Sequence, residues 1–170
     1  MKKALCAVLA AVLTLSLLSA CAGETQQEPV DLSAFAQTLR ETYEFAQHLS
    51  AMDPDAEEFA KQSIEQYLPG LLDMDLEQRV ICMSMMRLNN GEFSLVQTKN
   101  AQDAETVKEL FQNRVDYMVG DGESPGGAWY PGPTELWRNS SRVVSHGNYV
   151  MMVVAEECGQ IVDEFNALFE

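Results

Sequence analysis

The sequence predicts an α+β fold: N-terminal helices, then two strand-strand-helix units whose four strands form one antiparallel sheet with helices on one face. Apolar residues recur at helical spacing over residues 32–68. Two later apolar segments each contain a glycine turn and are followed by another helical pattern. The chain is 46% hydrophobic, which suffices for one core, so we expect a single α+β domain over residues 31–170.

The start of the chain is typical of an export signal. Two lysines precede an apolar run over residues 4–20, and Leu18-Ser19-Ala20-Cys21 follows the pattern of a bacterial lipobox. In a lipobox the cysteine thiol receives a diacylglyceryl group before the leader is removed. An uncleaved anchor is the alternative, but 17 helical residues span only about 26 Å of a ~30 Å hydrocarbon core. We therefore expect residues 1–20 to be a lipoprotein signal peptide and Cys21 to be the lipidated residue.

The small and polar residues that follow predict a flexible tether, so that residues 21–30 join the lipid to the domain. Loss of the leader removes two of the 11 bases and none of the 26 acids, and the net charge changes from −15 to −17. This charge argues against nucleic acid as a partner and against electrostatic adhesion to an anionic membrane. We expect the lipid on Cys21 to be the membrane attachment and the domain to lie on the extracytoplasmic face of the cell membrane.

Two amphipathic helices open the domain. Asp31 is a candidate N-cap for the first helix, which Pro54 ends. Its apolar stripe comprises Leu32, Phe35, Ala36, Leu39, Tyr43, Ala46 and Leu49. Asp55 and Glu58 resemble a capping box for the second helix, which runs to Pro69.

The first strand-strand-helix unit begins with an apolar strand over residues 80–88. Asn90-Gly91 predicts a hairpin turn, residues 93–98 alternate as the returning strand, and a helix begins at about Ala101.

The second unit repeats this order of elements. Residues 142–145 form a strand, His146-Gly147 the turn and residues 149–155 the partner strand, and a terminal helix begins near Cys158. Because each apolar strand face must pack against something, the two units predict one sheet covered by helices.

Several segments resemble a family of small bacterial lipoproteins from Gram-positive anaerobes, which is a domain of unknown function. The resemblance rests on the lipobox, the tether and the first helix, together with three segments: Gly91-Glu92-Phe93-Ser94-Leu95-Val96, residues 101–107, and Gly147-Asn148-Tyr149-Val150-Met151-Met152-Val153-Val154. It covers nearly the whole mature chain and implies no catalytic or binding residues.

Two cysteines remain in the body of the chain, Cys82 and Cys158. Export permits a disulfide between them, but both lie within apolar patterns, which favours buried free thiols.

Residues 122–126 match the pattern of a nucleophile elbow, with Ser124 as nucleophile and Glu135 and His146 following in hydrolase order. An elbow needs a strand before the serine and a helix after it, whereas here a helical pattern precedes and a Gly- and Pro-rich segment follows. We expect no catalytic residue here.

We also expect no metal and no cofactor. His48 and His146 stand alone, and zinc needs several ligands at short spacing. The acid pairs lack the glycine and terminal glutamate of a calcium loop; they are Asp53 with Asp55 and Asp73 with Asp75. The methionines suggest Cu(I), but core filling is the better interpretation; they are Met83, Met85, Met86, Met151 and Met152.

The connection over residues 120–137 is the best candidate for a working surface, because it holds both tryptophans and three of the six prolines. Trp129, Tyr130 and Trp137 are the candidate binding residues. The alternative, which we favour, is that the tryptophans fill the core.

The sequence thus favours a non-enzymatic binding or assembly module that meets a protein or cell-wall partner at the membrane. Two other classes stay open: an enzyme or enzyme subunit with dispersed carboxylates, and a purely structural scaffold.

Overall fold

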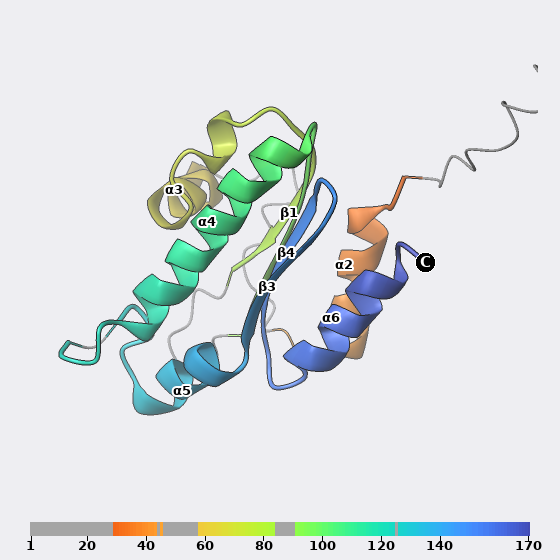
Figure 1. Cartoon of the computed structure of the whole chain (residues 1–170). Coiled ribbons are helices and arrows are strands. Elements are labelled where there is room, and N and C mark those ends of the chain that lie inside the picture. The colour runs from red at the N-terminus through yellow and green to blue at the C-terminus, as the bar shows by residue number, and fades with distance from the viewer. Residues whose placement is uncertain (1–28, 44, 46–57, 84–90, 125) are drawn as a thin grey trace, which may run out of the picture.

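The structure, a computed structural model, describes residues 29–43, 45, 58–83, 91–124 and 126–170 (Figure 1). Its helices are α2 (Leu32–Thr42), α3 (Glu58–Tyr67), the 3-10 helix η1 (Leu71–Asp73), α4 (Ala101–Val119), α5 (Pro131–Asn139) and α6 (Cys158–Ala167). Its strands are β1 (Leu76–Cys82), β2 (Glu92–Thr98), β3 (Ser141–His146) and β4 (Tyr149–Val154). The predicted leader, Cys21 and most of the tether lie outside the described residues. Within them, no helix is long and apolar enough to cross a membrane.

The four strands form one sheet in the order β1-β2-β4-β3, and every neighbouring pair is antiparallel. The α+β class, the four-stranded antiparallel sheet and the order of the elements along the chain are therefore confirmed. In the second unit His146 pairs with Tyr149, so the tight turn consists of Gly147 and Asn148. The predicted turn is thus displaced by one residue, because Gly147, with φ of +58°, supplies the left-handed backbone that such a turn requires.

The first hairpin differs more from its prediction. β1 begins at Leu76 and ends at Cys82, which pairs with Phe93, and β2 begins at Glu92, so residues 83–91 lie between the two strands. This register differs from the one that a two-residue turn at Asn90-Gly91 would give. Leu88 and Asn90 lie outside the described residues.

Helices cover both faces of the sheet, where the sequence predicted helices on one face. On one side α3, α4 and α5 pack over the strands, and on the other side lie α2 and α6 (Figure 1). In β4, Val150 and Met152 belong to the core beneath α3, α4 and α5, while Met151 and Val153 belong to the core beneath α2 and α6. Successive side chains of a strand point to opposite faces of the sheet, so a strand whose residues are all apolar has two faces to bury. One layer of helices can cover only one of these faces. We call the two sides the α4 face and the α6 face.

Helix α2 begins directly after its predicted capping residue. Asp31 accepts hydrogen bonds from the backbone N–H groups of Ser33 and Ala34, at 2.9 and 3.0 Å, and so caps α2 as predicted. Helix α2 ends at Thr42, before the predicted Leu49. The segment that would carry the rest of it, with Pro54 and Asp55, lies outside the described residues.

The beginning of the domain is tied to the sheet through Gln78. Its Nε2 donates to the carbonyl of Val30 at 2.7 Å, and its Oε1 accepts from the N–H of Leu32 at 2.9 Å. The chain therefore joins the α6 face at Val30, next to the start of α2.

Helix α5 was not predicted, because its first residues are Pro131, Gly132 and Pro133. Proline in the first turn lacks only an N–H that has no intrahelical acceptor, and its φ suits a helix. The connection predicted over residues 120–137 is therefore a shorter loop, followed by a helix that returns the chain to β3.

Candidate functional site

The loop between α4 and α5 folds back onto the end of α4. The N–H groups of Gly127 and Ala128 donate to the carbonyls of Tyr117 and Met118, at 2.8 and 3.1 Å. These bonds satisfy carbonyls that the end of a helix leaves without partners. Gly120 has φ of +74°, and a Cβ there would lie 2.6 Å from the backbone nitrogen of Gly126. Glycine at position 120 thus permits the close return of the loop.

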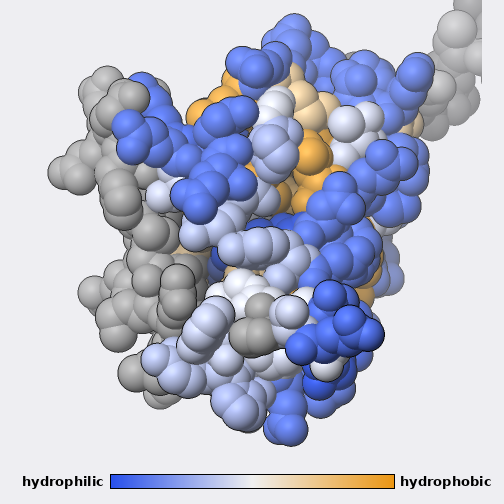
Figure 2. All heavy atoms as spheres, turned by 90° about the vertical axis from the view of Figure 1, so that its left-hand side faces the viewer, coloured by the Kyte–Doolittle hydropathy of each residue, from blue (hydrophilic) through white to orange (hydrophobic). Residues whose placement is uncertain are grey.

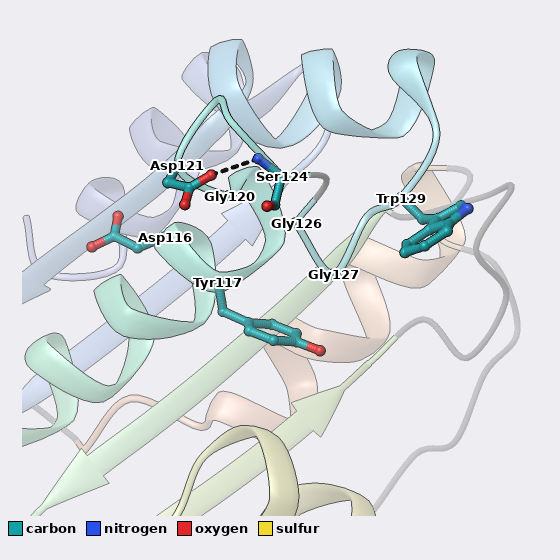
Figure 3. Close-up of a pocket in the computed structure, with 8 residues that line it drawn as sticks. All are labelled: Asp116, Tyr117, Gly120, Asp121, Ser124, Gly126, Gly127 and Trp129. Atoms are coloured by element: carbon teal, nitrogen blue, oxygen red, sulfur yellow. Dashed lines mark hydrogen bonds between the residues drawn. The ribbon is translucent and has the colours of Figure 1, made fainter.

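A turn within this loop is organised by Asp121. Its Oδ1 accepts from the N–H groups of Ser124 and Glu123, at 2.8 and 2.9 Å (Figure 3). These two hydrogen bonds, of which the one from Ser124 has the larger effect, hold the pKa of Asp121 below its usual value. The carboxylate therefore stays ionised across the neutral range.

The loop and α4 enclose a surface pocket of about 610 Å³. Its lining is drawn in Figure 3 and comprises Asp116, Tyr117, Gly120, Asp121, Ser124, Gly126, Gly127 and Trp129. The two carboxylates come from one side, and the rings of Tyr117 and Trp129 from the other (Figure 3). We call this the aromatic pocket. It combines aromatic rings with carboxylates, and its lining contains no lysine or arginine.

Two of the three exposed large aromatic side chains of the described residues, Tyr117 and Trp129, line this pocket, and Tyr130 follows Trp129 in the chain. Tyr117 and Trp129 are each 55% exposed and Tyr130 is 44% exposed, and they are the only large hydrophobic residues of the described part that are exposed. Figure 2 shows this side of the molecule, where residues of intermediate hydropathy fill the lower half and strongly hydrophilic residues border them on the right. Clustered exposed aromatic residues are typical of binding surfaces.

Trp129 also has an unusual backbone. Its φ of +63° is the only positive value for a residue other than glycine among the described residues. A bulky side chain in this region costs about 1–3 kcal/mol, and such strain is concentrated at functional sites. The fold thus retains a strained residue whose large ring is exposed at a pocket.

Trp137 does not join this surface. It is fully buried in the core of the α4 face. The structure therefore corrects the prediction that Trp137 is a binding residue together with Trp129 and Tyr130. Because Trp137 lies on the inner side of the amphipathic helix α5, it packs against the sheet. The core-filling alternative therefore holds for Trp137, whereas Trp129 and Tyr130 are exposed.

A second, smaller depression of about 260 Å³ adjoins the aromatic pocket and shares Tyr117 with it. Its other lining residues are Gln66, Tyr67, Pro69 and Asn113. The ring centroids of Tyr67 and Tyr117 are 6.1 Å apart. The two depressions thus form one lengthened surface that passes over Tyr117.

Beneath this surface lies an ion pair that the sequence analysis did not identify. Arg114 of α4 binds Glu92 of β2 through two hydrogen bonds of 3.0 Å, from Nε to Oε1 and from Nη2 to Oε2. Both side chains are nearly inaccessible, with exposures of 3% and 1%. The guanidinium also lies 4.5 Å from the centre of the Tyr67 ring. The pair therefore fixes the part of α4 that carries Tyr117. The spacing of Arg114 from Phe111 and Met118, on the apolar stripe of α4, is the signal that could have revealed it.

The remaining candidates have ordinary structural roles. Cys82 and Cys158 are buried thiols that form no disulfide with each other, as favoured, and burial raises the pKa of Cys82. The ring of His146 stacks on Phe169 with centroids 4.1 Å apart. Helix α4 separates Ser124 from the nearest preceding strand, so Ser124 lacks the context of an elbow.

In the described part of the chain, no group of three His, Cys, Asp or Glu residues could hold a metal ion. Met83 and Met152 pack in the core of the α4 face and Met151 in that of the α6 face. His48, Asp53, Asp55, Met85 and Met86 lie outside the described residues.

Fold and surface together define a small α+β domain with a mixed aromatic and acidic pocket at one end. Residues 50–155 match the family described as Domain of unknown function (DUF4358). The match covers more than half of the chain, and the protein belongs to this family. No curated protein and no solved structure matches the chain.

Proposed function

We propose that this protein is a lipid-anchored, non-enzymatic binding module that holds a protein or cell-wall partner in the aromatic pocket, at the extracytoplasmic face of the cell membrane. The observation that carries the proposal is that two of the three exposed large hydrophobic side chains of the described residues, Tyr117 and Trp129, line one pocket, and the third, Tyr130, follows Trp129 in the chain. Aromatic residues of this kind dominate the binding energy of many interfaces.

The position of the pocket suits an anchored module. The chain enters the domain at Val30, near the start of α2, and the loop that carries Trp129 lies at the opposite end of the molecule (Figure 1). A domain tethered to lipid through its N-terminal side would therefore turn the pocket away from the bilayer.

Both carboxylates of the pocket are exposed, whereas a catalytic acid or base commonly needs a carboxyl group whose pKa burial has raised.

The anchor is tested on the protein made by intact cells. Mass spectrometry of the mature N-terminus is expected to find a diacylglyceryl group on Cys21, and Cys21→Ala is expected to remove it. An exported protein with an unmodified Cys21 would contradict the anchoring half of the proposal.

The binding half is tested by photocrosslinking in the same cells. A photoreactive phenylalanine replaces Tyr130 beside the pocket or, as the matched control, the exposed Asp163 on α6. We expect crosslinks from position 130 that are absent from position 163 and that disappear when Trp129→Ala is added. Equal crosslinking from both positions, or crosslinks that survive Trp129→Ala, would remove the pocket from the proposal.

A further inference from the structure

We propose that the aromatic pocket binds a basic segment of a partner polypeptide, with lysine or arginine side chains placed between its rings and its carboxylates. This inference rests on the binding function proposed above and names the chemistry of the partner.

The charges of the surface select for a cationic ligand. Asp116 and Asp121 are the charged residues in the lining of the two depressions, and no base accompanies them. The carboxylate of Asp121 accepts hydrogen bonds from backbone N–H groups, which keep it ionised. The carboxylate of Asp116 accepts a hydrogen bond from Nε2 of Gln112 at 2.9 Å. Removal of the leader would take away two of the 11 bases and none of the 26 acids, so the mature chain would carry a net charge of −17. Such a field attracts cations and repels anionic partners.

The rings suit the same ligand. An ammonium or guanidinium group is attracted to the face of a tryptophan or tyrosine ring, and the long apolar stem of lysine or arginine packs against aromatic carbons. The molecule already contains this contact, because the guanidinium of Arg114 lies 4.5 Å from the centre of the Tyr67 ring. Tyr117 and Trp129 offer such faces at the surface, each 55% exposed.

The shape of the surface favours a segment of chain over a single small cation. The depressions of about 610 and 260 Å³ meet at Tyr117, so neighbouring basic side chains have two places to lie. The surface also lies far from the point where the chain enters the domain, which leaves it open to a partner (Figure 1).

The test uses the full-length protein purified from membranes in a neutral detergent, with hexalysine as the probe. Binding is measured by titration calorimetry at low ionic strength and by protection of Trp129 from acrylamide quenching. Trp137 is the internal reference, because it is buried and inaccessible to the quencher. We expect hexalysine to bind and to protect Trp129, and added salt to weaken the complex. Fully acetylated hexalysine, which keeps the stems and loses the charges, is expected not to bind.

Two charge-matched variants locate the binding. Asp116→Asn with Asp121→Asn keeps the acceptor oxygens of the loop and removes both charges. Asp163→Asn with Glu170→Gln makes the same change of charge at exposed positions of α6 and the C-terminus. We expect the pocket variant to weaken hexalysine binding by about tenfold or more and the control by less than about threefold. Trp129→Ala with Tyr117→Ala is likewise expected to weaken binding by about tenfold or more.

Four results would overturn the inference. Equal weakening by the two charge variants would mean that hexalysine follows overall charge. Equal binding of acetylated hexalysine would mean that the positive charge is irrelevant. Binding of chitohexaose, a neutral glycan, in place of hexalysine would reject the basic segment but keep the proposed binding function. Failure of every probe to bind would reject the inference alone, since the crosslinking experiment decides the binding function separately.

Discussion

The two faces of the sheet have different interiors. All five buried polar or charged residues of the described part lie on the α4 face or on its helices: Ser63, Glu92, Ser94, Thr98 and Arg114. The core of the α6 face consists of hydrophobic residues, including two buried cysteines, with aromatic contacts such as the one between Phe35 and Phe165, whose ring centroids are 6.1 Å apart.

Side-chain atoms that are buried without a hydrogen-bond partner follow the same division. Among the described residues they are Ser94 Oγ, Arg114 Nη1 and Trp137 Nε1, and all three residues belong to the α4 face. The aromatic pocket lies on the outer surface of this side of the molecule, at the end of α4. The comparison teaches that one side of the sheet provides apolar stability, while the other fixes the orientation of α4 with polar contacts that cost more to bury.

The largest effect is expected from breaking the buried pair. Arg114→Met leaves the carboxylate of Glu92 buried without its charged partner and is expected to lower the free energy of unfolding by about 3–5 kcal/mol. Adding Glu92→Leu removes the isolated charge, so the double variant is expected to regain most of that loss. Urea denaturation monitored by circular dichroism measures both. A double variant as unstable as the single one would mean that burial of charge is not the cause.

The matched control for this prediction lies on the α6 face. Leu39→Ala removes a fully buried apolar side chain and is expected to cost about 2–5 kcal/mol. Because no charge is involved there, this loss is expected to be the same at low and high salt. It should also leave the acrylamide quenching of Trp129 unchanged, whereas Arg114→Met should alter it.

A smaller effect is expected at Trp129. Trp129→Gly relieves the left-handed backbone, whereas Trp129→Ala keeps a Cβ in the same strained position. We expect the glycine variant to be more stable than the alanine variant by about 1 kcal/mol in urea denaturation. A more stable alanine variant would show that the loop is not strained at this residue.

A pH-dependent effect concerns a polar contact at the edge of the α6 face. The hydroxyl of Tyr43 donates to Oε1 of Glu164 at 2.6 Å. Burial, and then this hydrogen bond to a carboxylate, raises the pKa of Tyr43 to about 12. The folded state therefore favours the neutral phenol, and its contribution to stability is complete below pH 10 and lost as the pH rises toward 12.

Tyr43→Phe tests this contribution. Thermal denaturation from pH 8 to 12 is expected to show the wild type losing its advantage over the variant between about pH 10 and 12. The difference isolates Tyr43, because the other tyrosines titrate in both proteins. A difference that stays constant across this range would contradict the raised pKa.

Local signals in the sequence predicted the elements well where each signal acts within a few residues. Asp31 caps α2, the glycine of the second hairpin makes its turn, and Cys158 begins α6. Prediction failed where the deciding contacts are distant in the chain. The strand register that joins Cys82 to Phe93 depends on the whole sheet, and so does the return of the 126–128 segment onto α4.

The candidate site was only half predicted for the same reason. Gly- and Pro-rich composition marked the loop that carries Trp129 and Tyr130. Composition could not separate Trp129 from Trp137, because the helix that buries Trp137 begins with Pro-Gly-Pro. Nor could it place Asp116 and Tyr117 beside that loop, since this depends on hydrogen bonds to the end of α4.

The sequence by itself determined the α+β class, the order along the chain of the strands and of every α-helix described except α5, and the acidic charge, because periodicity, capping and composition are local properties. It also carries the Leu18-Ser19-Ala20-Cys21 pattern on which the anchoring proposal rests. Tertiary structure alone decided that both faces of the sheet are covered, that Arg114 meets Glu92 in the interior, and that Tyr117 and Trp129 share one pocket. Each of these depends on which distant segments pack together, and a pattern of neighbouring residues does not contain that information.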